Sequence, residues 1–147
     1  MLIRVTRVEP PALETVEICC YRISEEVQEI AAFVKSRQGQ LSGVLEGRQY
    51  EIAVGDIEYI ESVENRSYLY TKKQVYESSY RLYELEKMLR EKHFLRISKS
   101  MLLNLMKVQA IRPSLNSRFT AVLYSGEQVV ISRKYAPGLR KALKGGT

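Results

Sequence analysis

Short apolar segments separated by turn-forming residues recur along residues 41–132, and their spacing constrains the fold more than any other feature of the sequence. Segments of this kind at intervals of about 8–12 residues are typical of antiparallel sheets. The sequence therefore predicts a mainly β fold with a few short helices, in the α+β class. The expected strands are residues 41–46, 49–54, 57–63, 67–72, 74–78, 107–113, 118–124 and 128–132.

The residues before this β-rich part have a pattern of their own. Residues 2–8 (LIRVTRV) and 15–22 (TVEICCYR) each favour a strand, and Pro10 and Pro11 end the first. Residues 25–37 then show helical spacing of apolar side chains after Ser24, a favourable N-cap. We therefore expect a small β-β-α extension over residues 1–44 and a second unit over residues 45–147.

Two further helices are expected from the spacing of apolar side chains. Leu82, Leu85 and Leu89 recur at intervals that place them on one helical face. The last helix is expected near the end of the chain, after the final strand. The expected cap of the first of these helices is Ser78 or Ser79, and the last helix is expected over about residues 135–143, ending at Gly145 and Gly146.

The two cysteines, Cys19 and Cys20, are adjacent in the second expected strand. Neighbouring residues on a strand point to opposite faces, so the two thiols are poorly placed to bind one metal or to form an ordinary disulfide. Free cysteine behaves as a small apolar side chain. We expect one of them in the core and the other less buried.

Positive charge is concentrated in the final third of the chain, whose balance of +9 exceeds the net charge of +6. Residues 1–44 hold five basic and six acidic side chains, and residues 45–94 hold eight and ten. Residues 95–147 hold ten basic side chains against Glu127 alone. Such asymmetry is typical of a protein that binds a polyanion. The ten are Arg96, Lys99, Lys107, Arg112, Arg118, Arg133, Lys134, Arg140, Lys141 and Lys144.

The sequence offers little for catalysis. It contains one histidine, His93, and one aspartate, Asp56, and their spacing does not place them together. It has no HExxH, P-loop, GxGxxG or CxxC motif. We therefore expect no enzyme, metal site, cofactor or small-molecule substrate. No apolar run approaches the roughly 18 residues of a membrane span, and the N-terminus does not resemble a signal peptide, so a cytoplasmic location is expected.

Three segments, in this order, resemble the LytTR family of bacterial DNA-binding domains. They are DIEYIES at residues 56–62 with YLY at 68–70, LEKML at 85–89 with FLRISKSMLLN at 94–104, and GE at 126–127 leading into ISRKY at 131–135. Many family members carry histidine where this chain has Ser98. The first 44 residues contain no aspartate and do not resemble a receiver domain. The chain is thus similar to stand-alone LytTR regulators, in which a response-regulator-like output domain follows a short extension.

The resemblance implies an elongated fold of antiparallel sheets whose connecting loops enter successive major grooves of duplex DNA, to regulate bacterial transcription. It also implies a homodimer on DNA and, as a further partner, a membrane protein encoded nearby. The extension is expected to serve dimerisation or signal input. The expected base-reading residues are Asn65, Arg66, Ser67, Lys99, Arg133 and Lys134, and the expected phosphate-binding residues are Arg96, Ser98, Ser100, Arg118 and Lys141.

Two other functions are compatible with these residues. A single-strand or RNA-binding protein would use the basic grooves and the ten tyrosines for stacking, although the tyrosines on expected strands favour cross-strand packing. A protein-interaction adaptor, such as an anti-regulator, would use the extension. Asn104 follows two leucines, so we expect it to satisfy backbone groups rather than to contact DNA. Arg140 and Lys144 near a helix end are equally compatible with phosphate contact and with the helix dipole.

Overall fold

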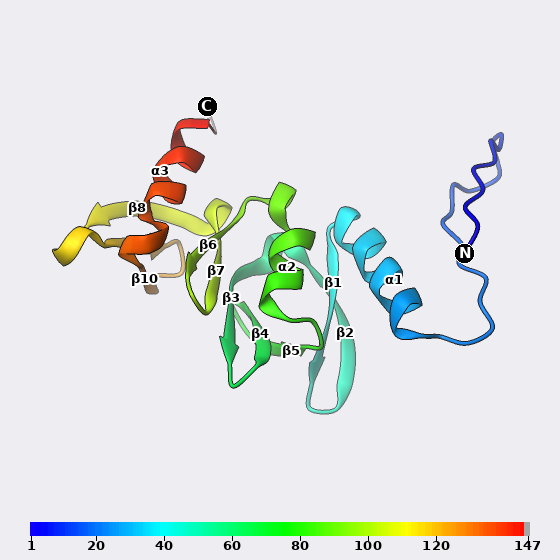
Figure 1. The fold of residues 1–147 in the computed structure, drawn as a ribbon, viewed down its shortest axis with the longest axis horizontal. Helices are drawn as coiled ribbons and strands as arrows, with labels where there is room; N and C mark the ends of the chain where they lie inside the picture. The colour runs from blue at the N-terminus through cyan, green and yellow to red at the C-terminus, as the bar shows by residue number, and fades with distance from the viewer. Residues whose placement is uncertain (146–147) are drawn as a thin grey trace.

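The structure, a computed structural model, describes the backbone of residues 1–145 and the side chains of residues 1–143. Within these residues the chain forms a seven-stranded antiparallel sheet, a three-stranded antiparallel sheet and three short α-helices (Figure 1). The strand order is β2-β1-β5-β4-β3-β7-β6 in the large sheet and β10-β9-β8 in the small one. The expectation of a mainly β fold with elongated antiparallel sheets is confirmed.

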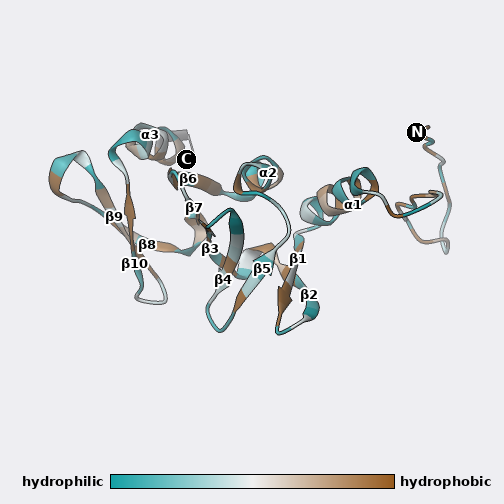
Figure 2. Cartoon of the chain, turned by 60° about the horizontal axis from the view of Figure 1, so that its bottom comes forward, coloured by the Kyte–Doolittle hydropathy of each residue, from teal (hydrophilic) through white to brown (hydrophobic). Residues whose placement is uncertain are grey.

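The elements have these bounds. The strands are β1 (Gln40–Leu45), β2 (Arg48–Ala53), β3 (Ile57–Val63), β4 (Arg66–Thr71), β5 (Val75–Ser78), β6 (Phe94–Ser98), β7 (Met101–Asn104), β8 (Val108–Pro113), β9 (Phe119–Leu123) and β10 (Gln128–Ile131). The helices are α1 (Glu25–Arg37), α2 (Leu82–Met88) and α3 (Ala136–Gly145), and a 3-10 turn, η5 (Arg133–Tyr135), leads into α3. Figure 2 shows the three helices in a row along one side of the strands.

Two apolar cores lie on opposite faces of the large sheet. On one face Ile60 and Leu69 pack with Leu85 of α2. On the other, Tyr59 packs with Ile131 of the small sheet, and Leu139 of α3 belongs to the same cluster. Because neighbouring strand residues point to opposite faces, Tyr59 and Ile60 serve different cores. Strand β3 is therefore buried on both sides and joins the helix-covered half to the small sheet.

The turn between β3 and β4 has two residues, Glu64 and Asn65, both with positive φ (51° and 65°). This is the backbone that two-residue hairpins require, and asparagine tolerates it better than most residues. The turn fixes the register that pairs Val63 with Arg66. The expected hairpin is confirmed, with a turn one residue shorter than predicted.

Helix α1 begins and ends as the sequence predicts. The Oγ of Ser24 accepts a hydrogen bond from the backbone N–H of Val27 at 3.3 Å, and acidic residues occupy the first turn. Gly39 follows the helix with φ of 83°, a conformation that glycine adopts without strain. Strand β1 crosses the expected division at residue 44, so the large sheet takes residues from both sides of it.

Residues 2–8 and 15–22, expected as strands, form neither helix nor strand. The prediction of a β-β-α extension is wrong in its two strands and right in its helix. A strand is stable only when its backbone groups are paired, and the described chain offers these segments no partner. The expected burial of one cysteine fails for the same reason, because Cys19 and Cys20 are both exposed.

Helix α2 is not capped by Ser78 or Ser79. Strand β5 extends to Ser78, which pairs with Ser67 of β4 and is buried. The helix begins at Leu82, and the Oε1 of Glu84 accepts a hydrogen bond from the backbone N–H of Arg81 at 2.9 Å. The last helix is confirmed near its expected position, whereas Gly146 of its expected end lies outside the described residues.

Candidate nucleic-acid interface

The β3–β4 turn and the β6–β7 turn lie at the same end of the large sheet. Strand β3 pairs antiparallel with β7, so the end of β3 meets the start of β7. The backbone N–H of Ser62 donates to the carbonyl of Ser100 at 2.8 Å. Asn65 and Lys99, which are far apart in the sequence, are therefore carried by neighbouring turns.

A second backbone hydrogen bond brings the end of the small sheet to the same region. The N–H of Ser132 donates to the carbonyl of Ile97 in β6 at 2.9 Å. Arg133 and Lys134 come directly after Ser132 in η5. Segments from all three sequence motifs thus meet around β6.

The register of the small sheet brings one more basic side chain, that of Arg118, to the same region. Ile131 of β10 pairs with Phe119 of β9, so Arg118 and Ser132 are the next residues on adjacent strands. The guanidinium of Arg140 on α3 lies 5.3 Å from the centre of the Phe119 ring. This end of the small sheet therefore presents basic side chains from the residue before β9, from η5 and from α3.

The Arg96 side chain holds the β6–β7 turn from within. Its Nε donates to the carbonyl of Ser98 at 2.9 Å, its Nη2 donates to the carbonyl of Lys99, and its Nη1 donates to the Oε1 of Glu86 on α2 at 2.9 Å. The side chain is only 20% exposed. The Oγ of Ser98 accepts a further hydrogen bond from the N–H of Ser100 at 3.2 Å. The turn that carries Lys99 is thus fixed to helix α2.

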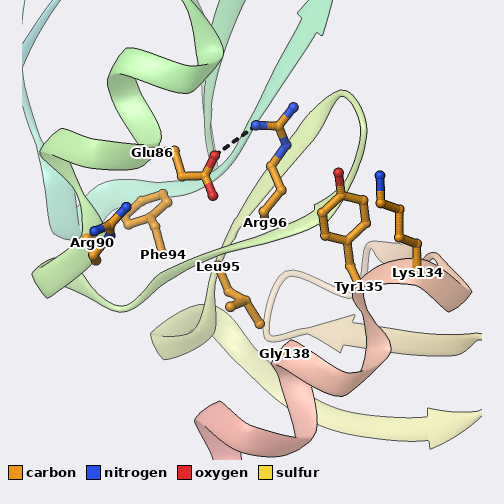
Figure 3. A pocket seen from close by; sticks show the side chains of 8 residues that line it. All are labelled: Glu86, Arg90, Phe94, Leu95, Arg96, Lys134, Tyr135 and Gly138. Atoms are coloured by element: carbon orange, nitrogen blue, oxygen red, sulfur yellow. Dashed lines mark hydrogen bonds and ion pairs between the residues drawn. The ribbon is translucent and has the colours of Figure 1, made fainter.

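Figure 3 shows Arg96, Tyr135 and Lys134 projecting side by side from β6 and η5, with Glu86 on the opposite side of Arg96. These side chains line a shallow pocket of about 360 Å³ between α2, β6 and α3. The Nζ of Lys134 lies 5.7 Å from the centre of the Tyr135 ring, an attractive cation–π distance. Lys99, Arg133 and Lys134 are all exposed.

Comparison with known proteins identifies the family. The family described as the LytTr DNA-binding domain matches residues 47–144, about two thirds of the chain. The chain belongs to the LytTR family.

The chain is also similar to curated proteins and to a solved structure. The sensory transduction protein LytT of Bacillus anthracis is 30% identical over 121 residues, 82% of this chain and 49% of that protein. LytT of Enterococcus faecalis is 33% identical over 99 residues, 67% of this chain and 40% of that protein. A solved LytTr DNA-binding domain from Bacillus cereus superposes with a TM-score of 0.68 at 25% identity, covering 71% of this chain and 96% of that one. The chain spans about half or less of the length of these curated relatives.

Five of the six residues expected to read bases are exposed in the LytTR domain, and the sixth is buried. Lys99, Arg133, Lys134 and Asn65 are exposed on the turns described above. Arg66 is also exposed, and its Nη1 lies 3.2 Å from the Oε1 of Glu77 in an exposed ion pair, which water screens strongly.

Ser67, the remaining residue expected to read bases, is only 2% exposed. It lies two residues from the buried Leu69 on β4, so both side chains face the α2 core. Its burial removes Ser67 from the base-reading set. The two-residue spacing to Leu69 is a signal in the sequence that could have shown this.

Among the expected phosphate-binding residues, Arg118 and Lys141 are exposed, and Ser98 and Ser100 are half-buried. Arg96 is mostly buried and makes three hydrogen bonds within the domain, by which its side chain orders the β6–β7 turn. Arg140 is exposed on α3, and the side chain of Lys144 lies outside the described residues.

Asn104 contacts backbone, as the sequence predicts. It is 2% exposed, its Nδ2 donates to the carbonyl of Ile57 at 2.8 Å, and its Oδ1 accepts from the N–H of Met106 at 3.0 Å. The side chain therefore joins the end of β7 to the start of β3, at the end of these strands opposite the β3–β4 and β6–β7 turns.

Tyr59 links the two sheets. Its hydroxyl donates to the Oε1 of Glu127 in the β9–β10 turn at 2.6 Å, and its ring stacks on that of Tyr70 with centres 4.4 Å apart. Burial, and next the hydrogen bond to the Glu127 carboxylate, raise the pKa of Tyr59. Cross-strand packing, which the sequence favours over stacking on bases, is confirmed for Tyr59 and Tyr70.

Two residues with clear roles, Glu86 and Glu127, were not found by sequence reasoning. Glu86 on α2 accepts a hydrogen bond from Arg96 on β6, and Glu127 accepts one from Tyr59, which is distant along the chain. In the sequence Glu127 stands out as the lone acid of the basic final third and as part of the third motif, but neither observation indicates its partner. No helix in residues 1–145 is long and apolar enough to span a membrane.

Proposed function

We propose that this LytTR domain binds duplex DNA sequence-specifically through its turns in the major groove and thereby regulates bacterial transcription in the cytoplasm. The observation that carries the proposal is the convergence of three motif segments through the Ser62–Ser100 and Ile97–Ser132 backbone hydrogen bonds. Within the described part of the chain, neither Lys99, Arg133 nor Lys134 takes part in an ion pair. Their charges are available to a polyanion.

The roles divide by chemistry. Lysine and arginine at the floor of the major groove donate to guanine O6 and N7, and asparagine pairs with adenine. We assign base reading to Lys99, Arg133 and Lys134, with Asn65 and Arg66 on the adjoining turn. Phosphate contacts, which set register, are assigned to Ser98, Ser100, Arg118 and Lys141.

The relatives suggest the biological setting. Sensory transduction proteins named LytT contain the matching region within chains about twice as long or longer. We infer that this chain gives the transcriptional output of a sensory pathway, as a homodimer on DNA. A membrane protein encoded nearby is the proposed source of the signal.

The test is binding of the full chain to the DNA upstream of its own operon, measured by fluorescence anisotropy. Scrambled duplex of equal length and composition is the control. We expect preference for the native sequence at physiological salt, because base contacts add to the phosphate contacts that both duplexes offer. Equal affinity for native and scrambled duplex would contradict the proposal.

The same assay separates the other functions. Competition by poly-U at equal affinity would indicate a single-strand or RNA-binding protein, because duplex major-groove readers do not accept such a ligand. A steep fall of log K with log salt is expected for a protein that neutralises several phosphates. Absence of any nucleic-acid binding, together with capture of a protein partner, would indicate an adaptor.

A further inference from the structure

The first 23 residues form an arm whose apolar side chains contact water. The large apolar side chains of this arm are almost all exposed, Val5 by 95% and Ile3 by 90%. Removing such side chains from water is favourable. The exposed apolar residues are Met1, Leu2, Ile3, Val5, Val8, Leu13, Val16, Tyr21 and Ile23.

The backbone of the arm is equally without partners. Its hydrogen bonds are local, from the N–H of Ala12 to the carbonyl of Glu9 and from the N–H of Ser24 to the carbonyl of Arg22. Among the described residues, none of residues 1–22 forms a hydrogen bond with either sheet or with α2 or α3. Figures 1 and 2 both show the arm beyond α1, away from the sheets.

The arm contains two apolar segments of opposite charge. Residues 2–8 carry Arg4 and Arg7 and no acid, and residues 14–17 carry Glu14 and Glu17 and no base. Both segments are rich in valine, isoleucine and threonine, which favour strands. A basic strand and an acidic strand on the same arm make its surface self-complementary, as a two-fold interface requires.

We propose that the arm is the homodimer interface, in which residues 2–8 of one copy pair with residues 14–22 of the second copy, and the reverse. A two-stranded hairpin within one chain is marginal in water, whereas two arms supply the four strands of a sheet that can bury an apolar face.

The pairing deepens the proposed function, because a dimer formed by the arms offers two DNA-binding domains to one duplex. It predicts self-association without DNA. A monomeric chain that still prefers its native duplex would overturn this inference and leave the proposed function intact.

The test uses charge reversal in the full chain under reducing conditions, so that Cys19 and Cys20 cannot crosslink. One variant carries Arg4→Glu with Arg7→Glu, and the other Glu14→Arg with Glu17→Arg. Each alone is expected to raise the dimer dissociation constant by roughly tenfold or more, measured by analytical ultracentrifugation, because like charges then face each other across the interface. The matched control, Lys72→Glu with Lys73→Glu in an exposed turn, is expected to leave it unchanged.

Mixing the two charge-reversed variants distinguishes pairing between two chains from pairing within one chain. In a mixed dimer each acidic segment meets a basic one, so heterodimers are expected to form with the affinity of the unmodified chain. Pairing within one chain would be rescued only when all four substitutions are combined in one molecule, and mixing would have no effect. Three outcomes would overturn the proposal. The unmodified chain could be monomeric at all concentrations, the control alone could lose dimerisation, or the mixture could fail to associate.

Discussion

The carbonyl oxygen of Ile97 accepts a hydrogen bond from the backbone N–H of Ser132 at 2.9 Å, and this contact decides where the basic end of the small sheet lies. Ile97 is fully buried, so the contact is protected from water. Lys99 follows Ile97 by two residues and Lys134 follows Ser132 by two. Two lysines from different sheets are thereby carried by segments that one backbone hydrogen bond joins.

Replacing Lys99 or Lys134 with alanine is expected to cost about 1–3 kcal/mol on the native duplex and to relax discrimination against altered bases. Each lysine is exposed, so folding should not change. Anisotropy titrations on the native duplex and on single-base variants measure the effect. Lys107→Ala, a lysine outside the three turns, is the control. An equal loss on every sequence would reassign the lysine to phosphate contact.

Arg96→Lys is expected to weaken DNA binding by disordering the turn that presents Lys99. Lysine retains the charge but cannot reach Ser98, Lys99 and Glu86 at once. The number of counterions released, measured as the slope of log K against log salt, should stay the same because no phosphate contact is lost.

Glu86→Gln is the matched variant for Arg96→Lys, because it weakens one of the three contacts and leaves Arg96 in place. We expect a smaller loss of affinity in the same direction. A salt slope that falls by about one on Arg96→Lys, with no effect of Glu86→Gln, would instead show that Arg96 binds phosphate.

The sequence predicted what depends on neighbours along the chain. Helix α1 follows from the Ser24 cap and the β3–β4 hairpin from Asn65, since caps and turns are set within a few residues. The family motifs predicted the turns that converge, although not that two backbone hydrogen bonds hold them.

Features that depend on a distant partner could not be predicted. The ordering of the β6–β7 turn by Arg96 depends on Glu86 on α2, and the pairing of these elements appears only after folding. Residues 2–8 have strand-forming composition, but a strand also needs a paired edge, which the described chain does not supply. Single-chain sequence patterns contain no information on that edge.

Asn104→Leu is expected to destabilise the domain by about 1–3 kcal/mol. The substitution removes the buried hydrogen bond to the carbonyl of Ile57, and a buried unpaired group costs about 1–3 kcal/mol. The N–H of Met106 also loses its partner, but Met106 is exposed and water can replace it. Urea unfolding followed by circular dichroism measures the change. Gln109→Leu, an exposed residue nearby in the sequence, should change stability by less than about 0.5 kcal/mol. Similar unfolding midpoints for the two variants would show that Asn104 does not link β7 to β3.

Tyr59→Phe is expected to lower the free energy of unfolding by about 1–3 kcal/mol at pH 7, through loss of the hydrogen bond to Glu127. The pKa of Tyr59 is raised above the ordinary tyrosine value of 10.0, first by burial and then by Glu127. The folded state therefore retains the phenolic proton more tightly than the unfolded chain. This contribution is complete below pH 10 and is lost as the pH rises from there, because the unfolded chain ionises first.

Urea unfolding of the unmodified chain and of Tyr59→Phe, at pH 7 and at pH 10.5, tests this dependence. The unmodified chain should lose more stability between the two pH values than the variant does. Tyr70→Phe is the matched control, because its hydroxyl donates to Glu61 over a longer 3.3 Å and both partners are on the large sheet. A loss for Tyr70→Phe equal to that for Tyr59→Phe would mean that the contact between the sheets adds nothing to ordinary tyrosine packing. A smaller loss for Tyr70→Phe would assign the excess to the Tyr59–Glu127 link, which holds the small sheet, and with it Arg133 and Lys134, against the large one.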